Sequence, residues 1–257
     1  MNRIITTLFG LLLIQLVVVN KTFSDEGEVK DCFEKLNRAT FALNMGLDKV
    51  IFKPISKGYR KLPSPIRNGT SNALSNLSNL ITIPNNMLQG DFGSAANNSA
   101  RLLINTTIGI AGIFDPANSL GFEKREKEDF GQSLGVMGVG EGCYLVLPVL
   151  GPSTVRDTLG SLIAMNGGDV WHNITVRDDE EYVKEFKESD YWVSRVTSGV
   201  DFRAKNLEAF DAMEKNSVDL YATVRSLYLQ DRKKKINNSR GKTEAMDDGD
   251  WDTLENQ

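Results

Sequence analysis

The side chains best suited to catalysis are few. The sequence contains one histidine, His172, and histidine is the commonest general base near neutral pH. A hydrolase of the Ser–His–Asp type would have to combine His172 with a nucleophile such as Ser153 and with an aspartate. His172 follows Trp171, and we interpret it as a packing or interface residue. The sequence therefore predicts no catalytic residue and a protein that is not an enzyme.

Two other clusters have simpler structural explanations. Glu128 and Asp129 are adjacent carboxylates, but no partner residues at glycosidase or metal-site spacing accompany them, so we expect an electrostatic role. Gly138, Gly140 and Gly142 do not match the spacing of phosphate-binding glycine loops, which lie between a strand and a helix. These glycines indicate backbone flexibility or close packing. No cofactor and no metal ion are expected.

Overall composition is that of an ordinary globular protein. The 257 residues are 40% hydrophobic and 25% charged, with a formal net charge of -4. Phosphate backbones are bound by clustered lysines and arginines, so this balance argues against a nucleic-acid partner. The basic run from Arg232 to Lys235 is interpreted as the start of a solvated tail, with contact to an anionic surface as the alternative.

The N-terminus predicts export. Arg3 precedes an uncharged stretch from Ile4 to Val19, and the small residues Thr22 and Ser24 follow at signal-peptidase spacing. The stretch is shorter than the roughly 20 residues that span a bilayer. Residues 1–24 are therefore expected to be a cleaved signal peptide, with an uncleaved anchor as the alternative.

Neither cysteine fits an anchor or metal motif. Cys32 does not directly follow the apolar run, so a bacterial lipid anchor is not predicted. Cys32 and Cys143 are not part of a CxxC motif, and in an oxidising compartment the two could pair. The sequence alone leaves that pairing open.

Hydrophobic periodicity predicts an all-α protein. One helical stripe contains Phe33, Leu36, Thr40, Leu43, Leu47 and Val50. Pro54, followed by Pro63 and Pro65, is expected to end this helix and Pro84 to interrupt the next, and Ser153 is the expected N-cap of a later one. Further helices are expected after Asp178, around Val193–Phe210 and around Leu220–Gln230.

The middle and the end of the chain have other patterns. Residues 108–151 are rich in glycine, and the run Tyr144–Leu147 could be a strand but has no evident partner nearby. Residues 232–257 are polar and are expected to be disordered. We therefore expect one helical domain over residues 25–231 with a glycine-rich, irregular middle.

An ordered series of short motifs resembles the MlaA/VacJ family of outer-membrane phospholipid-transport proteins. The series covers roughly residues 31–231, and its ordered sum is far more specific than any single motif. Its main parts are Asp31-Cys32-Phe33-Glu34-Lys35-Leu36-Asn37-Arg38, Leu88-Gln89-Gly90, Asn105-Thr106-Thr107-Ile108-Gly109-Ile110-Ala111-Gly112-Ile113-Phe114-Asp115-Pro116-Ala117, Glu128-Asp129-Phe130-Gly131-Gln132-Ser133-Leu134-Gly135, Gly151-Pro152-Ser153 and Arg225-Ser226-Leu227-Tyr228-Leu229-Gln230. Two departures stand out: the lipobox cysteine usual in the family is missing, and Cys32 and Cys143 occupy positions where the pattern has proline.

The resemblance implies a ring of amphipathic helices seated in the inner leaflet of the outer membrane, around a polar-lined passage. The implied function is to remove misplaced phospholipids from the outer leaflet and hand them to a periplasmic carrier, which maintains lipid asymmetry. Implied partners are phospholipid, the outer membrane, a porin trimer, and the carrier that feeds an inner-membrane ABC transporter. Two alternatives remain open: an extracytoplasmic lipid hydrolase, and a structural envelope protein that transfers no lipid.

Two segments are candidates for lipid handling. The first, a lipid passage or hinge, comprises Asn105, Thr106, Thr107, Ile108, Gly109, Ile110, Gly112, Ile113, Phe114 and Asp115; a buried loop is the alternative. If it is a gate, Gly109→Ala or Gly112→Ala should alter lipid flux and leave melting near wild type. The second, a membrane-interface helix, carries Leu74, Leu77, Leu80 and Ile81; a core helix with an amide-rich exposed face is the alternative.

Overall fold

The computed structural model describes residues 29–177 and 186–239, and this part of the chain is predominantly helical, which confirms the all-α prediction. The predicted signal segment and the helix expected after Asp178 lie outside or at the edge of the described residues. Within those residues, no helix combines the length and the hydropathy needed to cross a membrane.

The α-helices are α2 (Glu34–Leu47), α3 (Lys53–Arg60), α4 (Ser64–Leu88), α5 (Phe92–Thr107), α6 (Pro116–Ser119), α7 (Phe130–Val136), α8 (Val155–Ile163), α9 (Val170–His172), α10 (Glu188–Lys205), α11 (Leu207–Asn216) and α12 (Leu220–Ser239).

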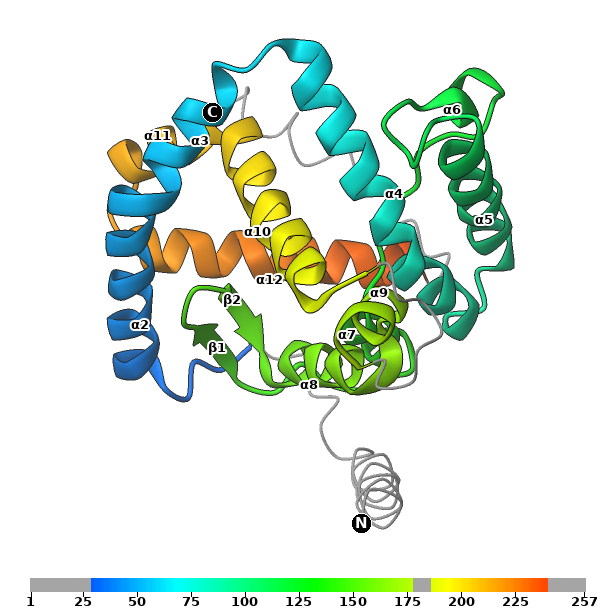
Figure 1. The fold of residues 1–257 in the computed structure, drawn as a ribbon. Helices are drawn as coiled ribbons and strands as arrows, with labels where there is room; N and C mark the ends of the chain where they lie inside the picture. Colours follow the sequence, from blue (N-terminus) through cyan, green and yellow to red (C-terminus); the bar gives the residue numbers. More distant parts are fainter. Residues whose placement is uncertain (1–28, 178–185, 240–257) are drawn as a thin grey trace, which may run out of the picture.

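Figure 1 shows how these helices are arranged. α2, α3 and α4 follow one another around the outline, and α5 lies alongside α4. A small hairpin, α8 and α7 close the lower side, while α10 and α12 lie across the interior of the view. The arrangement agrees with the expected ring of helices.

The irregular middle contains a β-hairpin. Strand β1 (Tyr144–Leu147) pairs antiparallel with β2 (Gly151–Thr154), so the partner of the first strand is only four residues further along the chain. The expectation that Tyr144–Leu147 lacks a nearby partner was therefore wrong. The N-cap of α8 is Thr154, the last residue of β2, and not Ser153 as expected; the Thr154 side chain accepts from the Asp157 amide.

Two asparagines of α2 complete the free edge of β1. Asn37 donates to the Tyr144 carbonyl (3.0 Å) and accepts from the Val146 amide (2.9 Å). One heptad later, Asn44 bonds the Leu147 carbonyl and the Val149 amide in the same way. The side chains thus satisfy backbone groups that a third strand would otherwise bind. This pairing fixes the position of α2 beside the hairpin.

The prolines interrupt helices less than expected. Pro54 lies in the first turn of α3, directly after the π-helical turn Asp48–Phe52, which continues from α2. The wider turn accommodates a residue that has no N–H to donate, so the chain remains helical through this point. Pro84 lies inside α4, which runs on to Leu88. The predicted breaks at both prolines were wrong.

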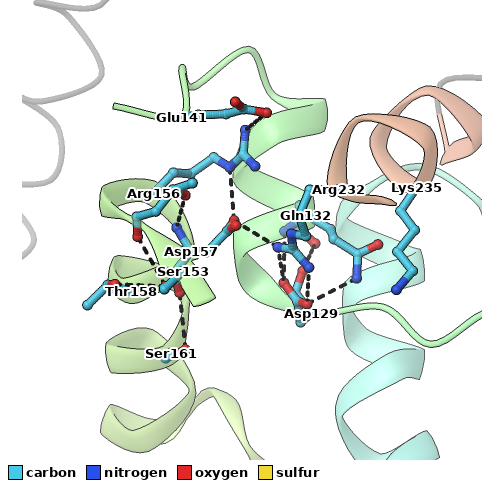
Figure 2. Close-up of polar contacts among 12 residues, drawn as sticks. Asp129, Gln132, Glu141, Ser153, Arg156, Asp157, Thr158, Ser161, Arg232 and Lys235 are labelled. Atoms are coloured by element: carbon cyan, nitrogen blue, oxygen red, sulfur yellow. Dashed lines mark hydrogen bonds and ion pairs between the residues drawn. The ribbon is translucent and has the colours of Figure 1, made fainter. Parts of the chain in front are cut away.

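The C-terminal boundary also differs from the prediction. α12 continues to Ser239, so residues 232–239 are helical rather than disordered, and Arg232 and Ile236 are buried. Arg232 binds both oxygens of Asp129, the N-cap of α7, and also Oδ1 of Asp157 on α8 (2.8 Å), as Figure 2 shows. A residue assigned to a solvated tail therefore joins three helices.

The carboxylates around Arg232 are held in the charged form. Burial by itself would raise the pKa of Asp129, but the hydrogen bonds and charge of Arg232 outweigh it and lower that pKa to about 2. Asp157 is buried, which alone would raise its pKa, but the charges of Arg232 and Arg156 bring that pKa below the ordinary value. Tyr228 of α12 donates a further hydrogen bond to Asp157 (2.6 Å). α7 and α8 can meet this closely because Gly131 and Gly160 face each other, where a Cβ on Gly160 would overlap the Gly131 backbone.

A disulfide joins the beginning of the described chain to the hairpin. Cys32 lies just before α2 and Cys143 just before β1, and the two residues are bonded with their Cα atoms 5.6 Å apart. The pairing that the sequence leaves open is thus present. A disulfide is typical of an oxidising compartment and leaves Cys32 without a free thiol.

Replacing Arg232 should destabilise the fold and shift its acid unfolding. Arg232→Met leaves Asp157 with one fewer cation in a buried site, so we expect a loss of about 3 kcal/mol in the free energy of unfolding. Depressed carboxyl pKa values stabilise the fold above pH ~4, and this contribution is lost as pH falls toward 2. Without Arg232 the pKa of Asp129 rises, so the acid-unfolding midpoint should move to higher pH.

Circular dichroism during urea and acid titrations measures both effects. The matched control is Lys233→Met, which removes a neighbouring exposed cation and should change neither midpoint appreciably. Equal behaviour of the two variants would show that the Arg232 network contributes little to stability.

Candidate functional site

The apolar stripe of α2 faces outward. Leu36, Leu43 and Val50, spaced at heptad intervals, are 65%, 55% and 75% exposed, and Phe33 is also exposed. The opposite face of the helix carries the buried Asn37. The periodicity predicted the helix correctly, but the structure places much of the apolar stripe on the surface and turns Asn37 inward.

This inversion extends over the described part of the chain. Its buried residues include 21 polar or charged ones and only 10 hydrophobic ones, the reverse of the usual preference in water-soluble proteins. Exposed large apolar residues occur on several elements. They include Ile51 and Ile55 near α3, Met87 and Leu88 on α4, Phe92 and Leu103 on α5, Val149 and Leu150 in the hairpin turn, and Trp192, Val193, Val196 and Phe202 on α10. Such a surface is typical of a protein that contacts lipid or a partner.

The interface between α4 and α5 is built from amide side chains. Asn76 donates to the Thr106 hydroxyl (2.8 Å), and Asn98 donates to Asn86 (2.9 Å). On α5, the buried residues Asn98, Arg101 and Asn105 follow one another at helical spacing. These two helices therefore pack through hydrogen bonds where most helix pairs pack through aliphatic side chains.

The predicted segment Asn105–Asp115 is anchored at both ends by one carboxylate. Arg101 binds both oxygens of Asp115 at 2.9 Å, and Asn105 donates to the same carboxylate and accepts from the Ala117 amide. Burial alone would raise the pKa of Asp115. Hydrogen bonds from Arg101, Asn105 and Lys124 exceed that effect and lower the pKa below its ordinary value. Asp115 also caps α6, so it closes the loop between α5 and α6.

Between these anchors the chain turns tightly and presents apolar side chains. Ile108, Ile110, Ile113 and Phe114 are all exposed, so the alternative of a buried loop is not what the structure shows for these side chains. Ile110 and Ala111 both have φ of +53°, a region that is uncommon for any residue but glycine and most costly for a β-branched residue such as Ile110. Strained backbone of this kind often accompanies function.

The two glycines of the segment are closely packed. A Cβ on Gly109 would lie 2.5 Å from the Asn105 carbonyl oxygen, and one on Gly112 would lie 2.6 Å from the Asn76 Cβ. Gly112 also has φ of +86°. Alanine at either position would therefore strain the fold, so the structure predicts lowered melting temperatures for Gly109→Ala and Gly112→Ala in place of near-normal melting. The role of the segment as a hinge or passage stays a prediction.

The second predicted segment is less exposed than expected. Leu74, Leu77, Leu80 and Ile81 of α4 are only half-exposed. Leu74, Leu77 and Ile81 line a cavity of about 50 Å³ with Trp171 and Arg195, so they face α9 and α10. The exposed stripe of α2 is a better candidate for membrane contact than this one.

The candidate catalytic residues are not arranged as a triad in the described structure. The His172 ring packs edge-on against Tyr191 (4.9 Å between centroids), and Ser153 is hydrogen-bonded to Thr158. The prediction of no catalytic residue assumed that the sequence has no Gly-x-Ser-x-Gly elbow, and this was wrong, because Gly131-Gln132-Ser133-Leu134-Gly135 has that spacing. Here that sequence lies in α7, and the buried Ser133 donates to Asn85 (2.6 Å).

No three His, Cys, Asp or Glu side chains among the described residues are grouped to hold a metal ion.

The Asp115 anchor can be tested by removing its charge alone. Asp115→Asn retains a capping oxygen for α6 but leaves the buried Arg101 without a carboxylate. We expect a loss of about 3 kcal/mol in unfolding free energy and faster proteolytic cleavage between residues 108 and 114. The control is Asp91→Asn, which caps α5 through the Ser94 amide and should cost less than about 1 kcal/mol. Unchanged proteolysis in Asp115→Asn would show that the ion pair does not hold the segment.

Comparisons with known proteins match this architecture. Residues 29–235 match the family model described as MlaA lipoprotein. The chain is 32% identical over 212 residues to the intermembrane phospholipid transport system lipoprotein MlaA of Escherichia coli, covering 80% of this chain and 78% of that protein. It is 34% identical over 200 residues to an uncharacterized protein of Rickettsia prowazekii, covering 77% and 75% of the two chains.

A solved structure gives the same result. A chain from work on the structural basis for maintenance of bacterial outer membrane lipid asymmetry matches with a TM-score of 0.67 and 30% identity. The match covers 81% of this chain and 100% of that one. With its helical arrangement, its inward-facing amides and its ordered motifs, this chain belongs to the MlaA lipoprotein family.

Proposed function

We propose that this protein takes part in intermembrane phospholipid transport. It removes phospholipids from the outer leaflet of a Gram-negative outer membrane through a polar-lined passage and passes them to a periplasmic carrier. The observation that carries the proposal is the inverted burial, with amides and charges inside and large apolar side chains outside. Relatives named for the same process, from Escherichia coli and Haemophilus influenzae, support it.

The physical chemistry of lipid movement explains why such a surface is useful. A charged headgroup crosses hydrocarbon slowly because its desolvation is costly. Helices with outward apolar stripes, such as α2, can lie in the membrane interface, while polar groups within the protein offer the headgroup an alternative to water. Transport of this kind requires no catalytic group.

Attachment and partners belong to the same proposal. The Cys32–Cys143 disulfide leaves no thiol on Cys32 for an acyl group, so the exposed apolar surface provides the membrane affinity. By resemblance, the protein acts with a porin trimer, and its phospholipid leaves through the carrier to an inner-membrane ABC transporter.

The function can be tested by complementation. The full chain is expressed in a Gram-negative strain that lacks its own MlaA protein, and surface phospholipid is measured by its accessibility to an externally added phospholipase. We expect surface phospholipid to fall toward the wild-type level. A chain that reaches the outer membrane without lowering surface phospholipid would support a structural envelope role instead.

The hydrolase alternative has a direct test. His172→Ala removes the only imidazole of the chain and should leave lipid clearance within about twofold of wild type, because the proposed transport needs no general base. Released fatty acid is measured in the same cells. Loss of clearance in a folded His172→Ala variant, together with loss of fatty-acid release, would establish hydrolysis.

A further inference from the structure

A cavity of about 170 Å³ lies between α2, the hairpin turn, α10, α11 and α12. Its walls are mainly apolar, with Phe41, Met45, Phe210, Met213, Leu220 and Val224 among the lining residues. None of the segment 105–115 lines it, so it is separate from the predicted hinge. An apolar cavity of about 150 Å³ holds a molecule the size of benzene, so this one has room for a short stretch of hydrocarbon.

One wall of the cavity is charged and incompletely paired. Arg203 forms two hydrogen bonds to Asp48, at 2.8 and 2.9 Å, and both residues line the cavity. The guanidinium also lies over the Phe210 ring, 4.8 Å from its centroid. Arg203 is only 7% exposed, yet its Nη1 has no hydrogen-bond partner among the described residues. A buried donor of this kind is costly unless a ligand or water accepts from it.

A residue with a strained backbone lines the cavity at the hairpin turn. Val149 has φ of +66°, which is unfavourable for a β-branched side chain, and it lines the cavity. Asn44 accepts from the Val149 amide (2.8 Å) and thereby holds this conformation. The strain is retained at the wall of the cavity, as is common at ligand sites.

The charges near the opening are mixed, with carboxylates outermost. Lys53 contacts Asp211 (2.8 Å) and Glu214 (3.8 Å), and Arg203 lies 3.7 Å from Asp211. Together with Asp48, the group contains three carboxylates, and the charge of Lys57 also acts on Asp211. The side chains of Asp211 and Glu214 are 41% and 47% exposed, whereas those of Lys53 and Arg203 are 22% and 8% exposed. A ligand that approaches from outside therefore meets carboxylates first.

We propose that this cavity is a subsite for a zwitterionic, amine-bearing phospholipid. A short segment of one acyl chain occupies the apolar part, the phosphodiester accepts from Nη1 of Arg203, and the ammonium group contacts Glu214. An anionic phospholipid has no ammonium group for the exposed carboxylates to attract, so we expect it to bind more weakly than an amine-bearing one. The inference rests on the proposed function, because it assigns a headgroup preference to a protein that handles phospholipids.

Photo-crosslinking locates the bound chain without any mutation. The full, disulfide-bonded protein is mixed with vesicles containing a phosphatidylethanolamine that carries a diazirine in one acyl chain, and labelled peptides are identified by mass spectrometry. We expect labelling to be enriched on peptides that contain Met213 and Val224. Unlabelled phosphatidylethanolamine should compete about fivefold better than phosphatidylglycerol, a difference of about 1 kcal/mol. Labelling spread over exposed apolar residues without this enrichment would overturn the subsite, and equal competition would overturn the headgroup preference.

Variants separate the cavity from general membrane contact. Met213→Trp fills the cavity and should reduce its labelling about tenfold, whereas Met165→Trp, at an exposed methionine outside the cavity, should not. Melting curves establish that both variants fold. If Met213→Trp does not fold, Glu214→Gln supplies the test, since it should abolish the preference for phosphatidylethanolamine and retain labelling. An unchanged preference in folded Glu214→Gln would contradict the assignment of the ammonium group.

The cellular assay of surface phospholipid tests the transport function separately from the cavity subsite. Labelled cavity residues in a protein that does not clear surface phospholipid would contradict transport but not the subsite. Clearance by a protein whose cavity is never labelled would contradict the subsite but not transport.

Discussion

A polar side chain that leaves water is stable only where another group in the protein replaces the hydrogen bonds it loses. Much of the described structure depends on meeting this condition. Asn37 and Asn44 bind the edge of β1, Asn76 and Asn98 join α4 to α5, and Arg232 links α12 to α7 and α8. Each contact has directional geometry, so the helices are held in defined positions without a large hydrocarbon core.

That arrangement frees the apolar side chains for the surface. In water, the exposed Leu36, Leu43 and Val50 would be a liability, because association or aggregation would bury them. In a lipid interface the same residues are favourable, and the inward polar groups can meet a headgroup. The fold and the proposed transport function therefore depend on the same reversal of inside and outside.

Distant parts of the chain are joined by covalent and ionic contacts. The disulfide connects Cys32 to Cys143, 111 residues apart in sequence, and restricts the unfolded chain. Arg232 makes its contacts across similar separations in sequence. Around the cavity, Asp48 and Arg203 play a similar part for α10 and the turn after α2. These contacts reduce the freedom of the helices to separate, which matters where the hydrophobic effect between them is weak.

The sequence by itself determined the helical class, most helix positions and the family. Helical periodicity survives whether the apolar stripe faces a core or a membrane, and the ordered motifs require no coordinates. The sequence also singled out the segment Asn105–Asp115, whose two ends are joined by the hydrogen bond from Asn105 to Asp115. Periodicity could not say which way the stripe of α2 faces, because a repeat reports spacing and not the surroundings.

Only the tertiary structure decided the remaining features. Arg232 looked like part of a solvated tail because its partners Asp129 and Asp157 lie about a hundred and about 75 residues away in sequence. The hairpin partner of β1, the pairing of Cys32 with Cys143, and the cavity beside Arg203 likewise depend on which segments meet in space. Local sequence encodes backbone preference, whereas burial, ion pairing and cavities arise from contacts between segments that are distant in the chain.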